Sequence, residues 1–62
     1  MRNTIVDYYG VKLNCIYQAY RDIDGEYTVI IDNILVGEHS ISPLINEDIW
    51  EYLEHLVLEQ TL

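Results

Sequence analysis

Cys15, His39 and His55 are the residues in this chain that could act as a nucleophile and its base. A catalytic cysteine needs a nearby base, and a third polar group usually orients that base. The sequence offers no such third group, and Cys15 falls on the apolar side of an alternating segment, where cysteine behaves as a small hydrophobic residue. We therefore expect no enzymatic activity. The three residues also lack the close spacing of a metal-binding pair such as Cys-x-x-Cys, so we expect neither a metal nor a cofactor.

A second candidate site is the stretch Asp22-Ile23-Asp24-Gly25, which is similar to the middle of an EF-hand calcium loop. If Asp24 and Gly25 take positions 5 and 6 of such a loop, Tyr20 and Ile31 take positions 1 and 12. Neither residue can supply the carboxylate that calcium requires there. Because Asp-Gly suits a tight turn, we predict a β-hairpin turn here instead.

The third candidate is residues 46–62, whose apolar residues repeat with the period of an α-helix. Asn46 is a favourable N-cap, whereas Glu59 near the end opposes the helix dipole, so we expect the helix to fray beyond Glu59. The side expected to pack on the rest of the protein contains Ile49, Trp50, Tyr52, Leu53, Leu56 and Val57. The opposite side is acidic and contains Glu47, Asp48, Glu51, Glu54 and Glu59.

The acidic side of this helix is the predicted partner-binding surface. Like charges one turn apart cost a helix about a few tenths of a kcal/mol, so helix stability does not explain the cluster. Leu58 projects into the middle of this side and would give it an apolar centre. We assign partner binding to Glu47, Asp48, Glu51, Glu54 and Leu58. The alternative is that the negative charge only keeps a small protein soluble.

His55 lies between Glu51 and Glu59, each one helical turn away. Both carboxylates would favour the charged imidazolium. Two interpretations follow, a pH-sensitive switch or a solvated surface histidine, and the geometry favours the second.

Eleven acidic residues against three basic ones give the chain a net charge of −8. Nucleic acids and anionic membranes repel so acidic a chain, so the partner we expect is a protein with a basic surface. The N-terminal residues lack the apolar segment of a secretory signal, and no apolar run is long enough to span a bilayer. We therefore expect a soluble, cytoplasmic protein.

Residues 1–62 are expected to form a single domain, whose core would be small for a stable monomer. Its single cysteine excludes an internal disulfide, and no metal is predicted, so self-association as a homodimer is the remaining way to add buried surface. Ile16 and Tyr20, on the outward side of a predicted strand, are assigned to self-association. The chain has six tyrosines, more than so small a core can hold, and exposed tyrosines suit an interface as well as a strand.

The rest of the chain predicts antiparallel strands at 4–9, 11–20 and 27–32. The apolar positions change phase between Ile31 and Ile34, which predicts a β-bulge or bend near Asn33. Gly37-Glu38 then suits a tight hairpin. The predicted fold class is α+β, a small antiparallel β-meander of three to four strands with one C-terminal amphipathic helix packed on the sheet.

The stretch Ile34-Leu35-Val36-Gly37-Glu38-His39-Ser40-Ile41-Ser42-Pro43-Leu44-Ile45, followed by an acidic helix, is similar to a pattern in small bacteriophage reading frames. Over about its last half, the chain resembles the small acidic accessory proteins of bacteriophages. Proteins of this kind often inhibit host enzymes or defence nucleases, some by presenting carboxylates where the target expects phosphates. The resemblance implies an inhibitor that binds a host or defence nucleic-acid enzyme through an acidic, DNA-mimicking surface. The alternative is a structural or assembly subunit that forms a homo-oligomer.

Overall fold

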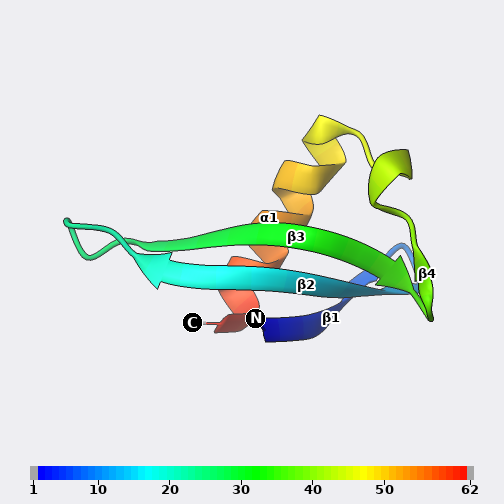
Figure 1. Ribbon diagram of the computed structural model, residues 1–62, viewed down its shortest axis with the longest axis horizontal. Helices are drawn as coiled ribbons and strands as arrows, with labels where there is room; N and C mark the ends of the chain where they lie inside the picture. The colour runs from blue at the N-terminus through cyan, green and yellow to red at the C-terminus, as the bar shows by residue number, and fades with distance from the viewer. Residues whose placement is uncertain (1, 62) are drawn as a thin grey trace.

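The computed structural model describes residues 2–61 and consists of a four-stranded antiparallel sheet with one helix on one face (Figure 1). The strand order β1-β2-β3-β4 follows the sequence, so each strand pairs with the next in a meander. This confirms the predicted α+β fold class. The elements in chain order are β1 (Arg2–Tyr8), β2 (Val11–Arg21), β3 (Tyr27–Val36), β4 (His39–Ser40), the 3₁₀ helix η1 (Ser42–Leu44) and α1 (Glu47–Thr61).

Two of the strand connections are organised by local backbone geometry. Tyr9 and Gly10 join β1 to β2 with φ angles of 50° and 81°, and positive φ at both central residues is the mark of a type I′ hairpin turn. Between β2 and β3, the carboxylate of Asp22 accepts hydrogen bonds from the backbone N–H groups of Asp24 and Glu26, both at 3.0 Å. As predicted, this acidic stretch forms a hairpin turn, and Asp22 is the side chain that shapes it.

A β-bulge interrupts β3 at the predicted place. Its neighbours Ile31 and Asn33 lie opposite successive residues of β2, so Asp32 is an extra residue without a partner there. The extra residue changes which face of the sheet the following side chains occupy. Ile34 consequently points into the core and is 0% exposed, whereas regular alternation after Ile31 would have turned it towards solvent.

Side chains around the bulge connect β3 to the segment that follows it. The side-chain oxygen of Asn33 accepts hydrogen bonds from the hydroxyls of Ser40, at 2.7 Å, and of Ser42. The Ser42 hydroxyl in turn accepts the N–H of Ile34 at 2.9 Å. These bonds satisfy backbone and side-chain groups beside the bulge and fix β4 and η1 against β3.

The helix α1 begins where the sequence predicts and ends later than predicted. The Asn46 side chain accepts the N–H of Ile49 at 2.9 Å, which is the expected N-cap. The prediction of fraying beyond Glu59 is wrong, because the helix continues to Thr61. Gln60 explains the difference: its side chain accepts a hydrogen bond from the Thr4 hydroxyl at 2.7 Å, which ties the last turn to β1.

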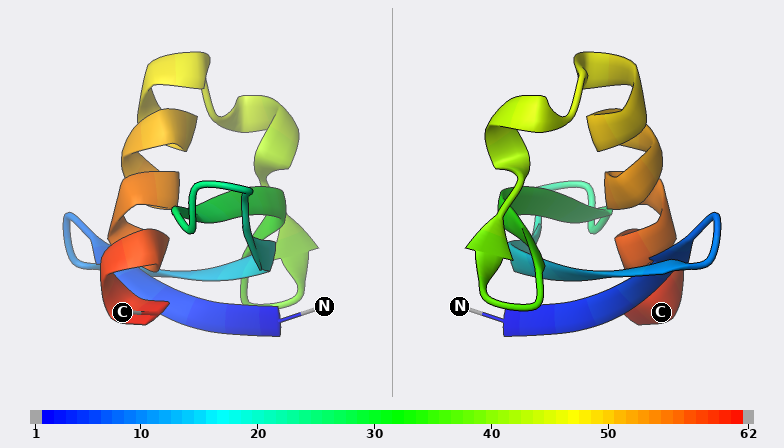
Figure 2. Two further views of the ribbon diagram at one scale, coloured as in Figure 1. Left: turned by 90° about the vertical axis from the view of Figure 1, so that its left-hand side faces the viewer. Right: turned by 90° about the vertical axis from the view of Figure 1, so that its right-hand side faces the viewer.

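The hydrophobic core lies between α1 and one face of the sheet, and the other face carries no second layer in residues 2–61 (Figure 2). The helix contributes Leu53 and Val57, which are fully buried. The inward-facing residues that the alternation of β2 predicts are buried at Leu13, Cys15 and Tyr17. The buried core comprises Val6, Leu13, Cys15, Tyr17, Val29, Ile31, Ile34, Leu53 and Val57.

Removing one methyl group from Ile34 tests whether the bulge places this side chain in the packed core. Ile34→Val should lower the free energy of unfolding by about 0.5–1.5 kcal/mol, because it leaves a small void in a packed interior. Ile30→Val is the matched control on the exposed face of the same strand, and its effect should stay within about 0.5 kcal/mol. Urea denaturation of both variants measures the difference. Equal losses would show that Ile34 is not the better packed of the two residues.

Candidate functional site

The exposed side of α1 carries the carboxylates of Glu47, Asp48 and Glu51, as predicted from helical spacing. Among residues 2–61, the only ion pair joins His55 Nε2 to Glu59 Oε1 at 3.0 Å, and it exists as an ion pair only when the histidine is protonated. The three carboxylates nearer the start of the helix therefore have no lysine or arginine partner in this part of the chain. A partner that approaches α1 meets their full negative charge.

Glu54 plays a different role from the one predicted. Its side chain is half-buried, and its Oε2 accepts the backbone N–H of Ile31 at 3.0 Å. β4 pairs only with Leu35 and Val36, so this part of the β3 edge has no neighbouring strand within residues 2–61. Glu54 thus satisfies an edge N–H group and helps to hold the helix on the sheet. This contact gives Glu54 a place in the packing of the helix that its spacing on α1 does not indicate.

Two apolar residues of α1 lie on the opposite side from the one predicted. Leu58, the predicted apolar centre of the acidic surface, is half-buried and packs against the core. Tyr52, predicted to face the core, is 51% exposed and lies beside Tyr8 instead. The side of α1 that is buried is the side that contacts β1 and β3. This side does not coincide fully with the apolar stripe of the sequence. The exposed acidic surface is therefore Glu47, Asp48 and Glu51.

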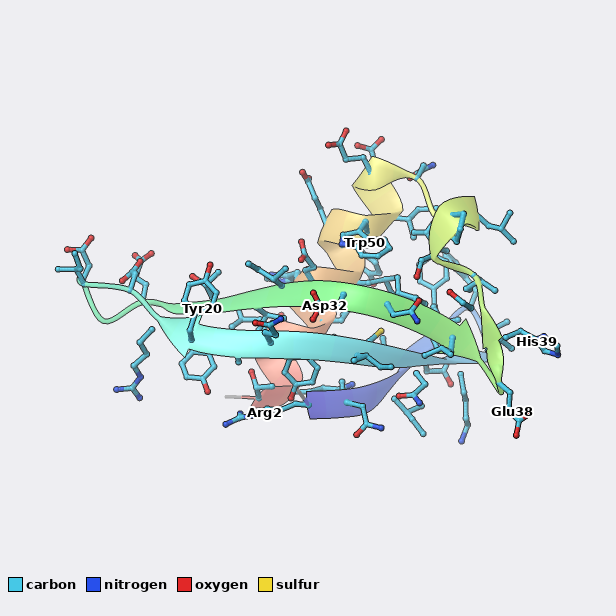
Figure 3. All side chains as sticks on the ribbon, viewed as in Figure 1. Arg2, Tyr20, Asp32, Glu38, His39 and Trp50 are labelled. Carbon is cyan, nitrogen blue, oxygen red and sulfur yellow. The ribbon has the colours of Figure 1, made fainter. Side chains whose placement is uncertain are left out.

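Cys15 and the two histidines are distributed over different parts of the molecule. Cys15 is fully buried in the core, and burial raises the pKa of its thiol, which keeps it in the protonated, poorly nucleophilic form. His39 is exposed beside Glu38 at the β3–β4 turn (Figure 3), and His55 is exposed on α1. The exposure of His55 agrees with the interpretation as a solvated histidine.

The face of the sheet opposite α1 contains the residues assigned to self-association. Tyr20 is 48% exposed and lies, with Asp32, on the side of the sheet turned away from the helix (Figure 3). Ile16 occupies the same face and is half-buried. Ile5 and Ile30 are exposed there as well, and sequence reasoning missed both. Their signal was present, since each alternates with a core residue of its own strand.

Residues 2–61 contain no cluster of three or more histidine, cysteine or acidic side chains that could hold a metal ion. The surface of this part of the chain has no cavity of ligand size. None of its helices combines the length and the apolar character needed to cross a membrane. Comparison with family models, with curated proteins and with solved structures finds no match for this chain.

Truncating Glu54 tests its structural role. Glu54→Ala should lower the free energy of unfolding by about 1–3 kcal/mol, because the Ile31 N–H loses its acceptor in a half-buried position. Glu54→Gln keeps an acceptor oxygen and should cost less. Glu51→Ala, on the exposed side of the same helix, is the control and should change stability by no more than about 0.5 kcal/mol. Thermal or urea denaturation measures the three variants. A Glu54→Ala effect equal to that of the control would contradict this role.

Proposed function

We propose that this chain is a non-enzymatic protein that binds the basic surface of a nucleic-acid enzyme and inhibits it by presenting carboxylates in place of phosphates. The observation that carries the proposal is the row of Glu47, Asp48 and Glu51, all exposed and without a cationic partner in the described residues. Glu47 and Asp48 lie in the first turn of α1, where negative charge interacts favourably with the helix dipole, whereas Glu51 lies beyond that turn and repels Glu47. Folding does not account for Glu51, and a basic partner would.

The charge density of the whole molecule supports mimicry of a nucleic-acid strand. The chain has a net charge of −8 and a longest dimension of 35 Å, which is about one net negative charge for every 4 Å. A single strand of B-DNA carries one phosphate charge per about 3.4 Å. The whole molecule thus carries negative charge at a density of the same order, and the row on α1 is the part of it proposed to contact the enzyme.

The proposed target is a host or defence nuclease, or a related nucleic-acid enzyme, with the chain acting as a bacteriophage-type inhibitor. Electrostatic binding of this kind is fast and strongly dependent on salt. It also competes with the enzyme's own substrate, because both ligands would occupy the same basic groove. These two properties distinguish the proposal from simple solubility, which needs no partner.

Neutralising the acidic surface tests the proposal. The triple variant Glu47→Gln, Asp48→Asn and Glu51→Gln should fold normally, while its capture of a basic nucleic-acid enzyme from host lysate should weaken about tenfold or more at low salt. The matched control removes the same number of charges far from α1, through Asp24→Asn, Glu26→Gln and Glu38→Gln. Capture by this control should weaken much less, because a local contact surface and not the net charge is proposed to bind.

Duplex DNA provides the second arm of this experiment. Added to the captured complex, it should release the enzyme and restore its activity. Equal weakening by the two triple variants would assign the effect to net charge alone, and an unchanged affinity of the acidic-surface variant would exclude α1 as the contact. A complex that DNA does not dissociate would exclude competition for the groove.

A second function is favoured by the open face of the sheet. We propose that Ile16 and Tyr20, together with Ile5 and Ile30, form a self-association surface that would serve a homodimer or a structural assembly. The supporting observation is that these apolar side chains share one face that neither α1 nor another layer within residues 2–61 covers. Burying one such large side chain in a partner contributes about 1.5–3 kcal/mol.

Sedimentation of surface variants tests self-association. The native chain should sediment as a dimer at high micromolar concentration, and Tyr20→Thr combined with Ile30→Thr should shift it to the monomer. Threonine keeps the β-propensity of both strands, so folding should persist. Ile23→Thr, at a fully exposed residue of the β2–β3 turn, is the control and should leave the dimer intact. A native chain that remains monomeric at the highest concentration would rule out this surface.

A further inference from the structure

Three tyrosine rings form a continuous row from the β1–β2 turn to the helix. The ring centroids of Tyr8 and Tyr9 lie 4.6 Å apart, and those of Tyr8 and Tyr52 lie 5.9 Å apart, both in edge-to-face arrangements. Figure 2 shows the turn beside α1 in both views. The two outer rings are open to solvent, since Tyr9 is 90% exposed and Tyr52 is 51% exposed. We call these three residues (Tyr9, Tyr8 and Tyr52) the tyrosine row.

Tyr9 has a backbone conformation that is unfavourable for a tyrosine. Its φ of 50° lies in the left-handed region, where asparagine, aspartate and glycine are favoured in the first central position of a type I′ turn. A tyrosine here has an unfavourable backbone conformation and places almost all of its side chain in water. Its contact with Tyr8 is the only compensation that the described residues provide. An aromatic ring at this point is better explained by a ligand than by stability.

A carboxylate lies beside the exposed end of the row at Tyr52. Asp48 lies one helical turn before Tyr52, so their side chains are neighbours on the surface of α1. Asp7 and Lys12 are cross-strand neighbours, so both side chains lie on the sheet face opposite to that of Tyr8, and the Asp7 carboxylate accepts the N–H of Gly10 at 3.0 Å. Asp48 is therefore the carboxylate that lies beside the row.

A surface that combines aromatic rings with carboxylates can bind an arginine side chain. A guanidinium stacks on a tyrosine ring and pairs with a carboxylate through its planar N–H groups. The chain already contains one such contact, since the guanidinium of Arg21 lies 5.8 Å from the ring centroid of Tyr27. The Tyr27 ring thus already has a cationic partner from the same chain. Within the described residues, no arginine or lysine lies over the rings of Tyr9 or Tyr52.

We infer that the tyrosine row and Asp48 form a docking surface for arginine side chains of the protein partner. This inference rests on the proposed function, since the same partner would offer its basic surface to α1. It adds a specificity that charge alone does not have. The acidic surface attracts both lysine and arginine through their charge, whereas the tyrosine rings add a stacking contact that favours arginine. The position of the row extends the contact from α1 to the β1–β2 turn.

Two fluorescently labelled peptides, hexa-arginine and hexa-lysine, test the inference by titration at one fixed low ionic strength. Hexa-arginine should bind the native chain about two- to fivefold tighter, the equivalent of one exposed cation–π contact. Tyr9→Asn and Tyr52→Gln should each remove this preference and leave a salt-dependent affinity that is equal for both peptides. Tyr9→Asn creates the favoured Asn-Gly turn, so its stability in urea should not fall. Tyr20→Thr, on the far face of the sheet, is the control and should keep the preference.

The outcomes separate the inference from the proposed function. Equal affinity of the native chain for the two peptides, or a preference that survives both tyrosine variants, would overturn the inference alone. The double variant Glu47→Gln and Glu51→Gln, which keeps Asp48, should bind both peptides more weakly and still prefer hexa-arginine. If that double variant bound both peptides as tightly as the native chain, the acidic surface and the proposed function would fail. A large loss of stability in Tyr9→Asn would assign Tyr9 to folding and would also overturn the inference.

Discussion

The bulge at Asp32 is the constraint on which the rest of the structure depends. A meander with one helix can bury only one face of its sheet, so every strand must present its apolar residues to that face. Along β3, regular alternation from Ile31 would direct Ile34 towards solvent. The one extra residue of the bulge shifts the alternation, so that Ile34 faces the core. The bonds of Asn33 to Ser40 and Ser42 then lead the chain from β3 into the segment that starts the helix.

The helix stabilises this small sheet by contacts at its edges as well as on its face. Leu53 and Val57 fill the core, while Glu54 accepts an N–H group at the edge of β3 and Gln60 contacts Thr4 of β1 at the other edge. Unpaired edge groups invite pairing with another chain, and polar side chains that occupy them oppose it. The apolar residues on the open face of the sheet are thus better suited to self-association than the strand edges are.

Partner recognition and self-association would use different surfaces of the same molecule. The acidic surface and the tyrosine row lie on and beside α1, whereas Ile16 and Tyr20 lie on the opposite face of the sheet. A dimer formed through that face would leave both helices exposed and would double the carboxylates available to a partner. The two proposed functions are therefore compatible in physical terms.

The sequence by itself determined the fold class, the bulge near Asn33, the Asn46 cap and the exposure of Glu47, Asp48 and Glu51. These features follow from short-range patterns, namely the period of apolar residues, turn chemistry and capping. Only the tertiary structure decided the roles of Glu54, Leu58 and Tyr52 and the meeting of Tyr8 with Tyr52. Helical periodicity places a residue at an angle around the helix axis, but the direction of the sheet relative to that axis depends on contacts between residues far apart in the chain.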